Sequence, residues 1–358
     1  MPSDYGYANA RIRALKGALL DRQAFDALVA SSSIEALVQL LARTAYKPDV
    51  ESALLRYSAA ACLGDALRRN LARTIGSLWR FFDDGPRELI GLLVARWDLF
   101  NLIAILRGQA NGIAAADILS VLVPAGAISE IELRELVKQP TIQASGELMM
   151  TWRLPFAAAL AEALRLSGDN LVNLEARLHQ IRFRDAFMRL GKGINNELVR
   201  EILESEIDAA NLSLVIRIAT LRKATDKSVH LLAFDPSQQL IAGGRLPLPL
   251  LAELAQATDG EALMGRLAET SWGPALGRHR ERFRESGDPV VLERALEEML
   301  ALKGIRMFHR DPLTIGIAIG YLSAKITEVA SLRLISQGKE LGWPVDEIRA
   351  ELFWLGRE

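Results

Sequence analysis

The stretch EVASLRLISQGKELG, residues 328–342, contains a pattern that occurs twice earlier in the chain. The pattern is acidic-x-x-(Asn/Ser)-Leu-x-x-(Ile/Val)-x-(Arg/Gln), and it recurs in DLFNLIAILR (98–107) and DAANLSLVIR (208–217). Its three polar positions are Asp98, Asn101 and Arg107, then Asp208, Asn211 and Arg217, then Glu328, Ser331 and Gln337. Three occurrences of one pattern indicate an internal repeat.

Three further markers precede each occurrence of this pattern, always in the same order. A glycine-marked turn comes first, at Gly17, Gly126 and Gly244, which precede the acidic residue by 81, 82 and 84 residues. Thr-x-x-x-Pro follows at 44–48, 151–155 and 270–274, and Leu-x-x-x-Leu follows at 63–67, 174–178 and 292–296. This order predicts three copies of a unit of about 115 residues. The expected domains are residues 1–112, 113–232 and 233–358.

Apolar residues recur every three or four positions in each copy, which is typical of helices with one buried face. In 194–223, for example, they are Leu198, Ile202, Ile207, Leu212, Val215 and Ile218. Two long helices are expected per copy, over 49–82 and 87–108, 171–190 and 194–223, and 289–308 and 312–342. Only VHLLAF (229–234) resembles a strand, and its signal is weak. The sequence therefore predicts an all-α fold.

The repeated polar positions allow two interpretations. In the first, the Asn and Ser side chains hydrogen-bond a neighbouring helix and the acids pair with arginines, so that the set fixes helix packing. In the second, the three sets line one shared central surface. The sequence favours packing and leaves both possibilities open.

Composition excludes several classes of protein. The 358 residues carry a formal net charge of −1, which gives no basic excess for nucleic acid. The single cysteine, Cys62, excludes an internal disulfide and fits a reducing compartment. The N-terminus lacks the apolar segment of a signal peptide, and the longest uncharged apolar stretch, 312–324, is too short to cross a bilayer. We therefore expect a soluble cytoplasmic protein.

Searches for catalytic chemistry find no motif, so we expect no catalytic residue, cofactor or metal. No phosphate-binding Gly-x-x-x-x-Gly-Lys-(Ser/Thr) or Gly-x-Ser-x-Gly elbow occurs. Asp83 and Asp84 lack the third acid of a metal-binding motif, because Arg87 takes its place. RHRERFRE (278–285) alternates charge and is expected to be a solvated helix face, or alternatively a partner patch. The histidines show no metal-ligand spacing: His179, His230, His279 and His309.

Three segments resemble the C subunit of the bacterial and archaeal V/A-type ATPases, which is the equivalent of the d subunit of eukaryotic V-ATPases. They are YGYANARIRALKGALL (5–20), with Tyr5, Tyr7, Asn9, Ala10, Arg11 and Arg13, GGRLP (243–247), and EVASLRLISQGKELGWPVDEIRAEL (328–352). The resemblance extends from about residue 5 to the C-terminus. The third copy departs from the family pattern, since the family favours Asn where Ser331 stands and a basic residue where Gln337 stands.

The resemblance implies a non-catalytic protein with three similar helical domains in a pseudo-threefold funnel. Such a protein holds the shaft subunits D and F and rests on the membrane rotor ring of proteolipid subunits, peripheral on the inner membrane without inserting into the bilayer. Gly and Pro residues in 108–126 and 235–249 suggest adjustable joints between stiff domains. A free-standing helical-repeat scaffold for protein partners is the alternative function, and an all-α enzyme is a third.

Overall fold

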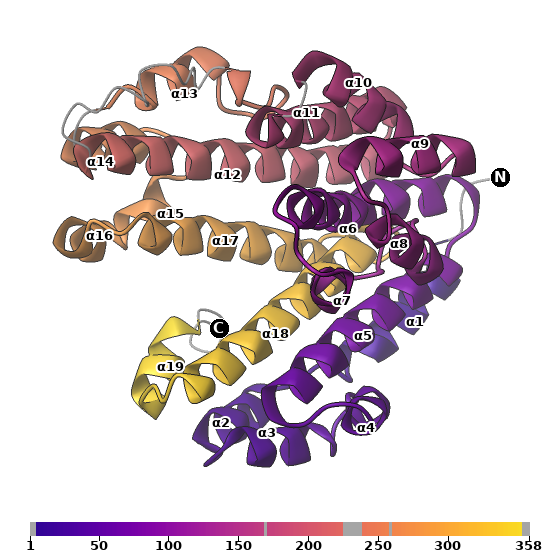
Figure 1. The fold of residues 1–358 in the computed structure, drawn as a ribbon. Coiled ribbons are helices and arrows are strands. Elements are labelled where there is room, and N and C mark those ends of the chain that lie inside the picture. Colours follow the sequence, from indigo (N-terminus) through magenta and orange to yellow (C-terminus); the bar gives the residue numbers. More distant parts are fainter. Residues whose placement is uncertain (1–4, 168–169, 225–237, 258–259, 353–358) are drawn as a thin grey trace. The chain divides into compact units, whose positions relative to one another are not determined.

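The computed structural model describes residues 5–167, 170–224, 238–257 and 260–352, and every regular element in these ranges is a helix (Figure 1). The all-α prediction is therefore confirmed for the described part of the chain. The strand-like segment 229–234 lies outside the described residues.

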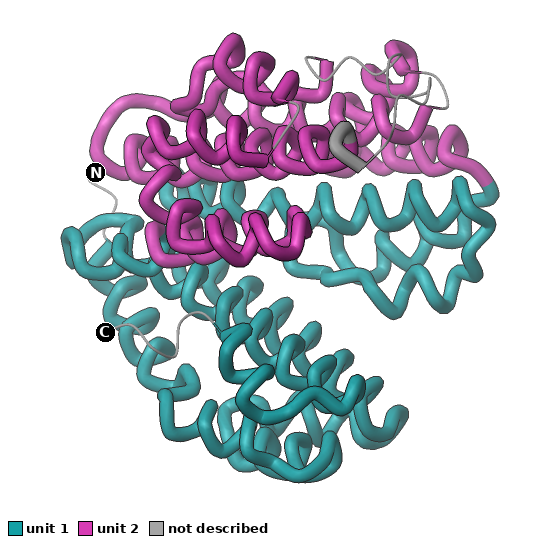
Figure 2. Tube along the Cα trace, turned by 90° about the vertical axis from the view of Figure 1, so that its left-hand side faces the viewer, with its two compact units in different colours: residues 1–140, 304–358 teal, residues 141–303 magenta. Residues whose placement is uncertain are grey.

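The chain forms two compact units, which Figure 2 distinguishes by colour. Unit 1 comprises residues 1–140 and 304–358, and unit 2 comprises residues 141–303. Unit 1 contains α1 (Gly6–Lys16), α2 (Arg22–Ala30), α3 (Ile34–Leu41), α4 (Lys47–Leu54), α5 (Ala59–Arg80), α6 (Asp84–Ala110), α7 (Ala115–Val121), α8 (Glu130–Val137), η3 (Met307–His309), α18 (Gly316–Glu340) and α19 (Val345–Glu351). Unit 2 contains α9 (Ile142–Trp152), α10 (Ala157–Ser167), α11 (Leu171–Arg189), α12 (Ile194–Ala224), α13 (Leu248–Leu254), α14 (Gly260–Ala268), α15 (Gly273–Gly277), α16 (Arg280–Ser286) and most of α17 (Pro289–Arg306).

Local sequence fixes where many of these helices begin. The side chains of Asp21, Ser33 and Thr141 accept hydrogen bonds from backbone amides in the first turns of α2, α3 and α9. Ser129 and Glu132 form a reciprocal capping box at the start of α8. These side chains satisfy amides that the first helical turn leaves without partners.

In unit 1 the C-terminal helix α18 packs against helices from the N-terminal part of the chain, chiefly α5 and also α1 and α3. It runs alongside α5 in Figure 1. Asn9 of α1 fixes the approach to α18 by donating to the carbonyl oxygens of Pro312 and Thr314, both at 2.9 Å. The two ends of the sequence thus share one core.

In unit 2 the long helix α12 contacts α11, α13 and α14. All six apolar positions that the sequence assigned to the buried face of this segment are buried. Leu212 and Val215 join the core together with Leu263, Leu292 and Leu296 from the following helices. Burying these side chains supplies the main driving force for folding of the unit.

The order of elements repeats three times along the chain. Each Leu-x-x-x-Leu pair lies on one buried face, of α5, α11 and α17 respectively. The acidic pattern lies on the helix that comes next among the α-helices, α6, α12 and α18. Each pair of long helices follows a series of shorter ones: α2–α4, α8–α10 and α13–α16.

The long helix expected over 49–82 is instead two helices, α4 and α5, with a break at residues 55–58. The amide of Tyr57 bonds to the carbonyl of Ala53, and Ala59 has a φ of 50°, which ends one helix and redirects the chain. The sequence did not indicate this break because 55–58 contains neither Gly nor Pro. The corresponding junction before α17 contains Gly287, with a φ of 64°.

Among the described residues, α6 alone is long and apolar enough to cross a membrane by length and composition. Within its most apolar stretch, 61% of the residues are buried inside the protein. Core helices have the same composition, and α6 carries buried polar side chains that bind other parts of unit 1, as described below.

The close approach of α18 to η3 yields a stability prediction. A Cβ added at Gly320 would lie 2.6 Å from the backbone nitrogen of Phe308. We expect Gly320→Ala to lower the free energy of unfolding by about 1–3 kcal/mol, because the backbones must separate. Gly76→Ala is the control, since a Cβ there meets nothing within 4 Å and alanine favours the helix by about 0.5–1 kcal/mol. Urea denaturation measures both, and equal effects of the two substitutions would contradict this packing.

Candidate functional site

The acidic residue of each copy is buried and accepts hydrogen bonds from backbone amides just before a short helix. For Asp98 and Asp208 this helix comes later in the chain, and for Glu328 it comes earlier. The amides of Ala127 and Ile128 donate to the Asp98 carboxylate at 2.9 and 2.8 Å. The amide of Leu246 donates to Asp208 at 3.0 Å, and that of Leu20 donates to Glu328 at 2.6 Å. Ile128, Leu246 and Leu20 each directly precede the N-cap residue of a helix, of α8, α13 and α2 respectively. The three carboxylates therefore make equivalent bonds.

The asparagine of the pattern binds the same segment five residues earlier. The Asn101 side chain donates to the carbonyl of Val123 and accepts from its amide, both at 2.7 Å. Asn211 makes the same pair of bonds to Ile241, both at 2.8 Å. Each amide side chain thus satisfies both polar groups of one backbone residue in the interior. We call each acid with its Asn or Ser an anchor.

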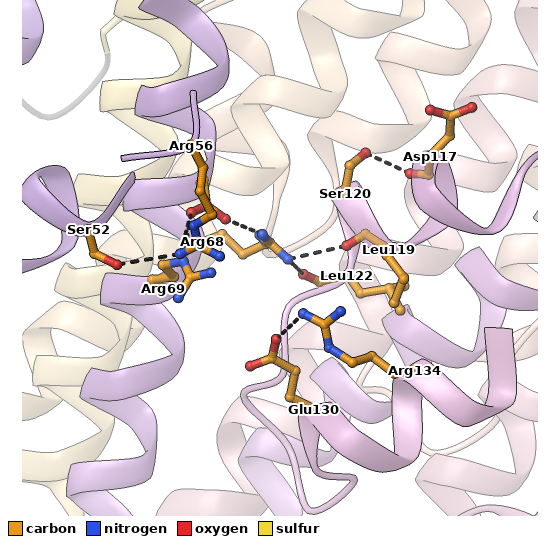
Figure 3. A network of polar contacts seen from close by, with 11 residues as sticks. Ser52, Arg56, Arg68, Arg69, Asp117, Leu119, Ser120, Leu122, Glu130 and Arg134 are labelled. Carbon is orange, nitrogen blue, oxygen red and sulfur yellow. Dashed lines mark hydrogen bonds and ion pairs between the residues drawn. The ribbon is translucent and has the colours of Figure 1, made fainter. Parts of the chain in front are cut away.

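A side chain from the preceding helix reinforces two of these anchors. Arg68 of α5 donates to the carbonyl oxygens of Leu119 and Leu122 at 3.2 and 3.1 Å, as Figure 3 shows. Gln180 of α11 donates to those of Gln238 and Leu240, both at 2.9 Å. The segments that lead into α8 and α13 are therefore held from two helices each.

The third anchor contains a buried ion pair. Lys325, one turn before Glu328 on α18, donates to its Oε1 at 2.6 Å and to the hydroxyl of Tyr46 at 2.8 Å. Tyr46 in turn donates to Glu328 Oε1 at 2.7 Å. Burial lowers the pKa of Lys325, and burial followed by the Glu328 charge raises the pKa of Tyr46. The mutual hydrogen bonds compensate for removing these groups from water.

The other two acids differ in their surroundings. Burial raises the pKa of Asp98 to about 6, although the two backbone amides oppose the shift. Burial also raises the pKa of Asp208, against the amide of Leu246, the Trp272 side chain and the charge of Lys303. The carboxylate at Asp98 is thus held by backbone amides, whereas a cation lies near the other two.

The last polar positions of the pattern, Arg107, Arg217 and Gln337, are exposed. Arg217 pairs with Glu293 of α17, with 2.9 Å between Nη2 and Oε2. Ser331 is buried like the asparagines. The sequence suggested arginine partners for the acids and helical partners for the asparagines, whereas the structure gives backbone partners in the segments between helices.

The Thr-x-x-x-Pro marker is the same turn in the first and third copies. The Thr44 hydroxyl donates to Leu41 and accepts from the amide of Tyr46, at 2.7 and 3.2 Å. Thr270 makes the matching bonds to Leu267 and Trp272 at the same distances. In the second copy Thr151 lies within α9 and bonds to Glu147, so this copy departs from the turn.

Glycine packs directly against two anchors. A Cβ at Gly126 would lie 2.1 Å from an Asp98 oxygen, and one at Gly244 would lie 2.2 Å from an Asp208 oxygen. Gly17, the proposed marker of the first copy, does not take this role. Gly126 lies two residues before Ile128, whose amide donates to Asp98, whereas the residue two places before Leu20, whose amide donates to Glu328, is Ala18. The glycine register in the first copy was therefore one residue off.

The remaining sequence candidates occupy surface positions or local pairs. Arg280 pairs with Glu261 and Arg284 with Glu281, which fits a solvated face for 278–285. Asp83 and Asp84 stand at the start of α6. Among the described residues, no group of three or more His, Cys, Asp or Glu side chains is arranged to hold a metal.

The chain is similar to known proteins over nearly its full length. Residues 8–351 match the family model described as ATP synthase (C/AC39) subunit. The chain is 27% identical to the C subunit of the A-type ATP synthase of Methanosarcina mazei, over 98% of this chain and 93% of that protein. It is 29% identical to the C subunit of the V-type ATP synthase of Thermus thermophilus (98% and 99%), and 27% identical to that of Deinococcus radiodurans (98% and 92%).

The asparagine anchors generate a stability prediction. We expect Asn101→Ala and Asn211→Ala each to lower the free energy of unfolding by about 1–3 kcal/mol. The first removes the partner of the buried Val123 amide, whose carbonyl still accepts from Ala125, and the second removes the partners of both the amide and the carbonyl of Ile241. Asn111→Ala is the matched control, since among the described residues its exposed side chain bonds to the Arg107 carbonyl one turn earlier. Urea denaturation measures all three, and an Asn101 variant as stable as the Asn111 variant would refute the anchor.

The Asp98 anchor predicts a pH dependence. The folded protein holds the Asp98 proton up to a pKa of about 6, whereas an unfolded aspartate releases it near 3.8. Protonation therefore favours the folded state, and this contribution is present below about pH 4 and lost as the pH rises through 6. We expect the stability of the wild type relative to Asp98→Asn to be greater at pH 4.5 than at pH 7.5. Urea denaturation at both values is the test, and a difference that stays constant or grows with pH would contradict it.

Proposed function

The chain belongs to the ATP synthase (C/AC39) subunit family, and from this membership we propose that it couples the central shaft of a rotary V/A-type ATPase to the membrane rotor ring. It is a structural subunit of the complex and not a catalytic one. The proposed partners are the shaft subunits D and F and the ring of proteolipid subunits. The proposed location is the cytoplasmic face of the inner membrane, on the ring and outside the bilayer.

We also propose that the three copies, residues 1–112, 113–232 and 233–358, are domains of a pseudo-threefold funnel. The order of the anchors supports this arrangement. Asp98 in the first copy binds the segment that opens the second, and Asp208 in the second binds the segment that opens the third. Glu328 in the third binds Leu20 in the first. A cyclic order of bonds is what a closed collar requires, whereas an open array leaves its last copy without such a partner.

The chemistry of the anchors suits a part that transmits torque. Each acid of an anchor makes a buried, charge-assisted hydrogen bond to backbone, and breaking that bond removes the partner of a buried amide. The anchored residues 123–128 and 241–246 are therefore rigid in this proposal. The adjustment expected between copies falls instead outside them, for example at Gly112, whose φ is 63°. Family membership sets aside the free-standing scaffold and the all-α enzyme.

The proposal predicts uncoupling when the chain is removed. We expect the soluble catalytic head to hydrolyse ATP without this chain, while ATP-driven ion movement into membrane vesicles is lost and returns when the chain is added back. Charge reversal at Arg280 and Arg284 serves as the control, because exposed ion pairs contribute only about 0–1 kcal/mol each and pumping should persist. Full pumping in vesicles that lack the chain would refute the coupling role.

A further inference from the structure

The repeat exposes a place on unit 1 where one expected carboxylate is missing. In unit 2, Glu293 of α17 accepts from the hydroxyl of Ser213 at 2.8 Å and pairs with Arg217, both on α12. Glu293 directly follows the first leucine of its Leu-x-x-x-Leu marker. The residue in that position of the first copy is Gly64 on α5. The acid of unit 2 thus corresponds to a position without a side chain.

The donors that correspond to Ser213 and Arg217 are still present on α18. Ser213 and Arg217 stand two and six residues after Asn211, and the residues at the same offsets from Ser331 are Arg333 and Gln337. They lie one turn apart on α18, which packs against α5. Both side chains are exposed, and Arg333 has no ion-pair or hydrogen-bond partner within the described ranges 5–167, 170–224, 238–257 and 260–352.

The surroundings of Gly64 are open and positively charged. A Cβ added at Gly64 would meet no atom within 4 Å. Around this position Arg56, Arg68 and Arg69 share the buried Asp65, so that three cations face one anion, a formal excess of +2. Partial desolvation and then the Arg68 charge lower the pKa of Arg333, whose helix α18 packs against α5.

We propose that the Gly64 site, formed by Gly64 and Arg68 of α5 with Arg333 and Gln337 of α18, binds an acidic side chain of a partner protein. The carboxylate would take the place that Glu293 occupies in unit 2, with the Arg333 guanidinium and the Gln337 amide as donors. A guanidinium without an acid gains a charge-assisted hydrogen bond from such a ligand. Identifying the partner as another component of the rotary complex rests on the proposed function; the site itself does not.

A built-in carboxylate tests whether the donors reach the position. Gly64→Glu and Gly64→Gln have similar helix propensity, so only the charge separates them. We expect the Glu variant to melt about 1–3 °C higher than the Gln variant, and the difference to vanish in the Arg333→Gln background. Equal melting temperatures for Gly64→Glu and Gly64→Gln in the protein that retains Arg333 would overturn the proposal.

Binding of an acidic probe tests the ligand class. The full-length chain is titrated into a fluorescein-labelled tetraglutamate peptide at low ionic strength, with fluorescence anisotropy as the readout. We expect Gly64→Glu and Arg333→Gln each to weaken binding roughly threefold to tenfold, while Arg278→Gln, which removes an exposed arginine of unit 2, leaves it unchanged. Equal binding by all variants would overturn the site. The vesicle pumping assay reports on the coupling role separately, so failure of one does not imply failure of the other.

Discussion

The structure depends on one constraint: a carboxylate buried in a long helix must find donors, and it finds them in backbone amides of a segment that leads into a short helix. Asp98, Asp208 and Glu328 all meet this constraint in the same way. The amides they bind precede helix N-caps, where the chain has just left irregular structure and needs partners for its polar groups. One bond therefore satisfies a buried charge, fixes the start of a short helix and joins segments as far apart in sequence as 30 residues for Asp98 and 308 for Glu328.

The neighbouring residues add further hydrogen bonds around each carboxylate, and these differ from copy to copy. Asn101 and Asn211 add a two-point contact to one backbone residue, and Arg68 and Gln180 add carbonyl contacts from a second helix. The third copy has Ser331 in place of Asn and gains a buried Lys325–Glu328–Tyr46 network instead. This network joins sequence positions that are 282 residues apart, where no short chain connection assists the contact. A stronger set of polar bonds is physically reasonable there, because closing a long loop costs conformational entropy.

Divergence among the copies is also where function beyond packing is expected. The position after the first marker leucine is Gly64 in one copy and Glu293 in another, and the matching donors on the long helices are Arg333 and Ser213. An internal acid satisfies the donors in unit 2, while an excess of arginine remains on unit 1. Under the proposed function, a protein built from similar copies needs such differences to present distinct surfaces to its two proposed partners, the shaft and the ring. Charge at equivalent positions provides that distinction without changing the backbone.

The sequence by itself determined the all-α class and the family, and it predicted the threefold repeat. Apolar periodicity in 194–223 and the Leu-x-x-x-Leu pairs depends on local helical geometry, so their burial could be read directly. The partners of the polar positions could not be read, because a carboxylate or an asparagine indicates only that a donor is needed. Which backbone amide supplies it is settled by the tertiary fold, across 30 residues for Asp98 and 308 for Glu328. The break between α4 and α5 and the off-by-one glycine marker have the same origin: both depend on how backbones meet in space, which residue type alone does not specify.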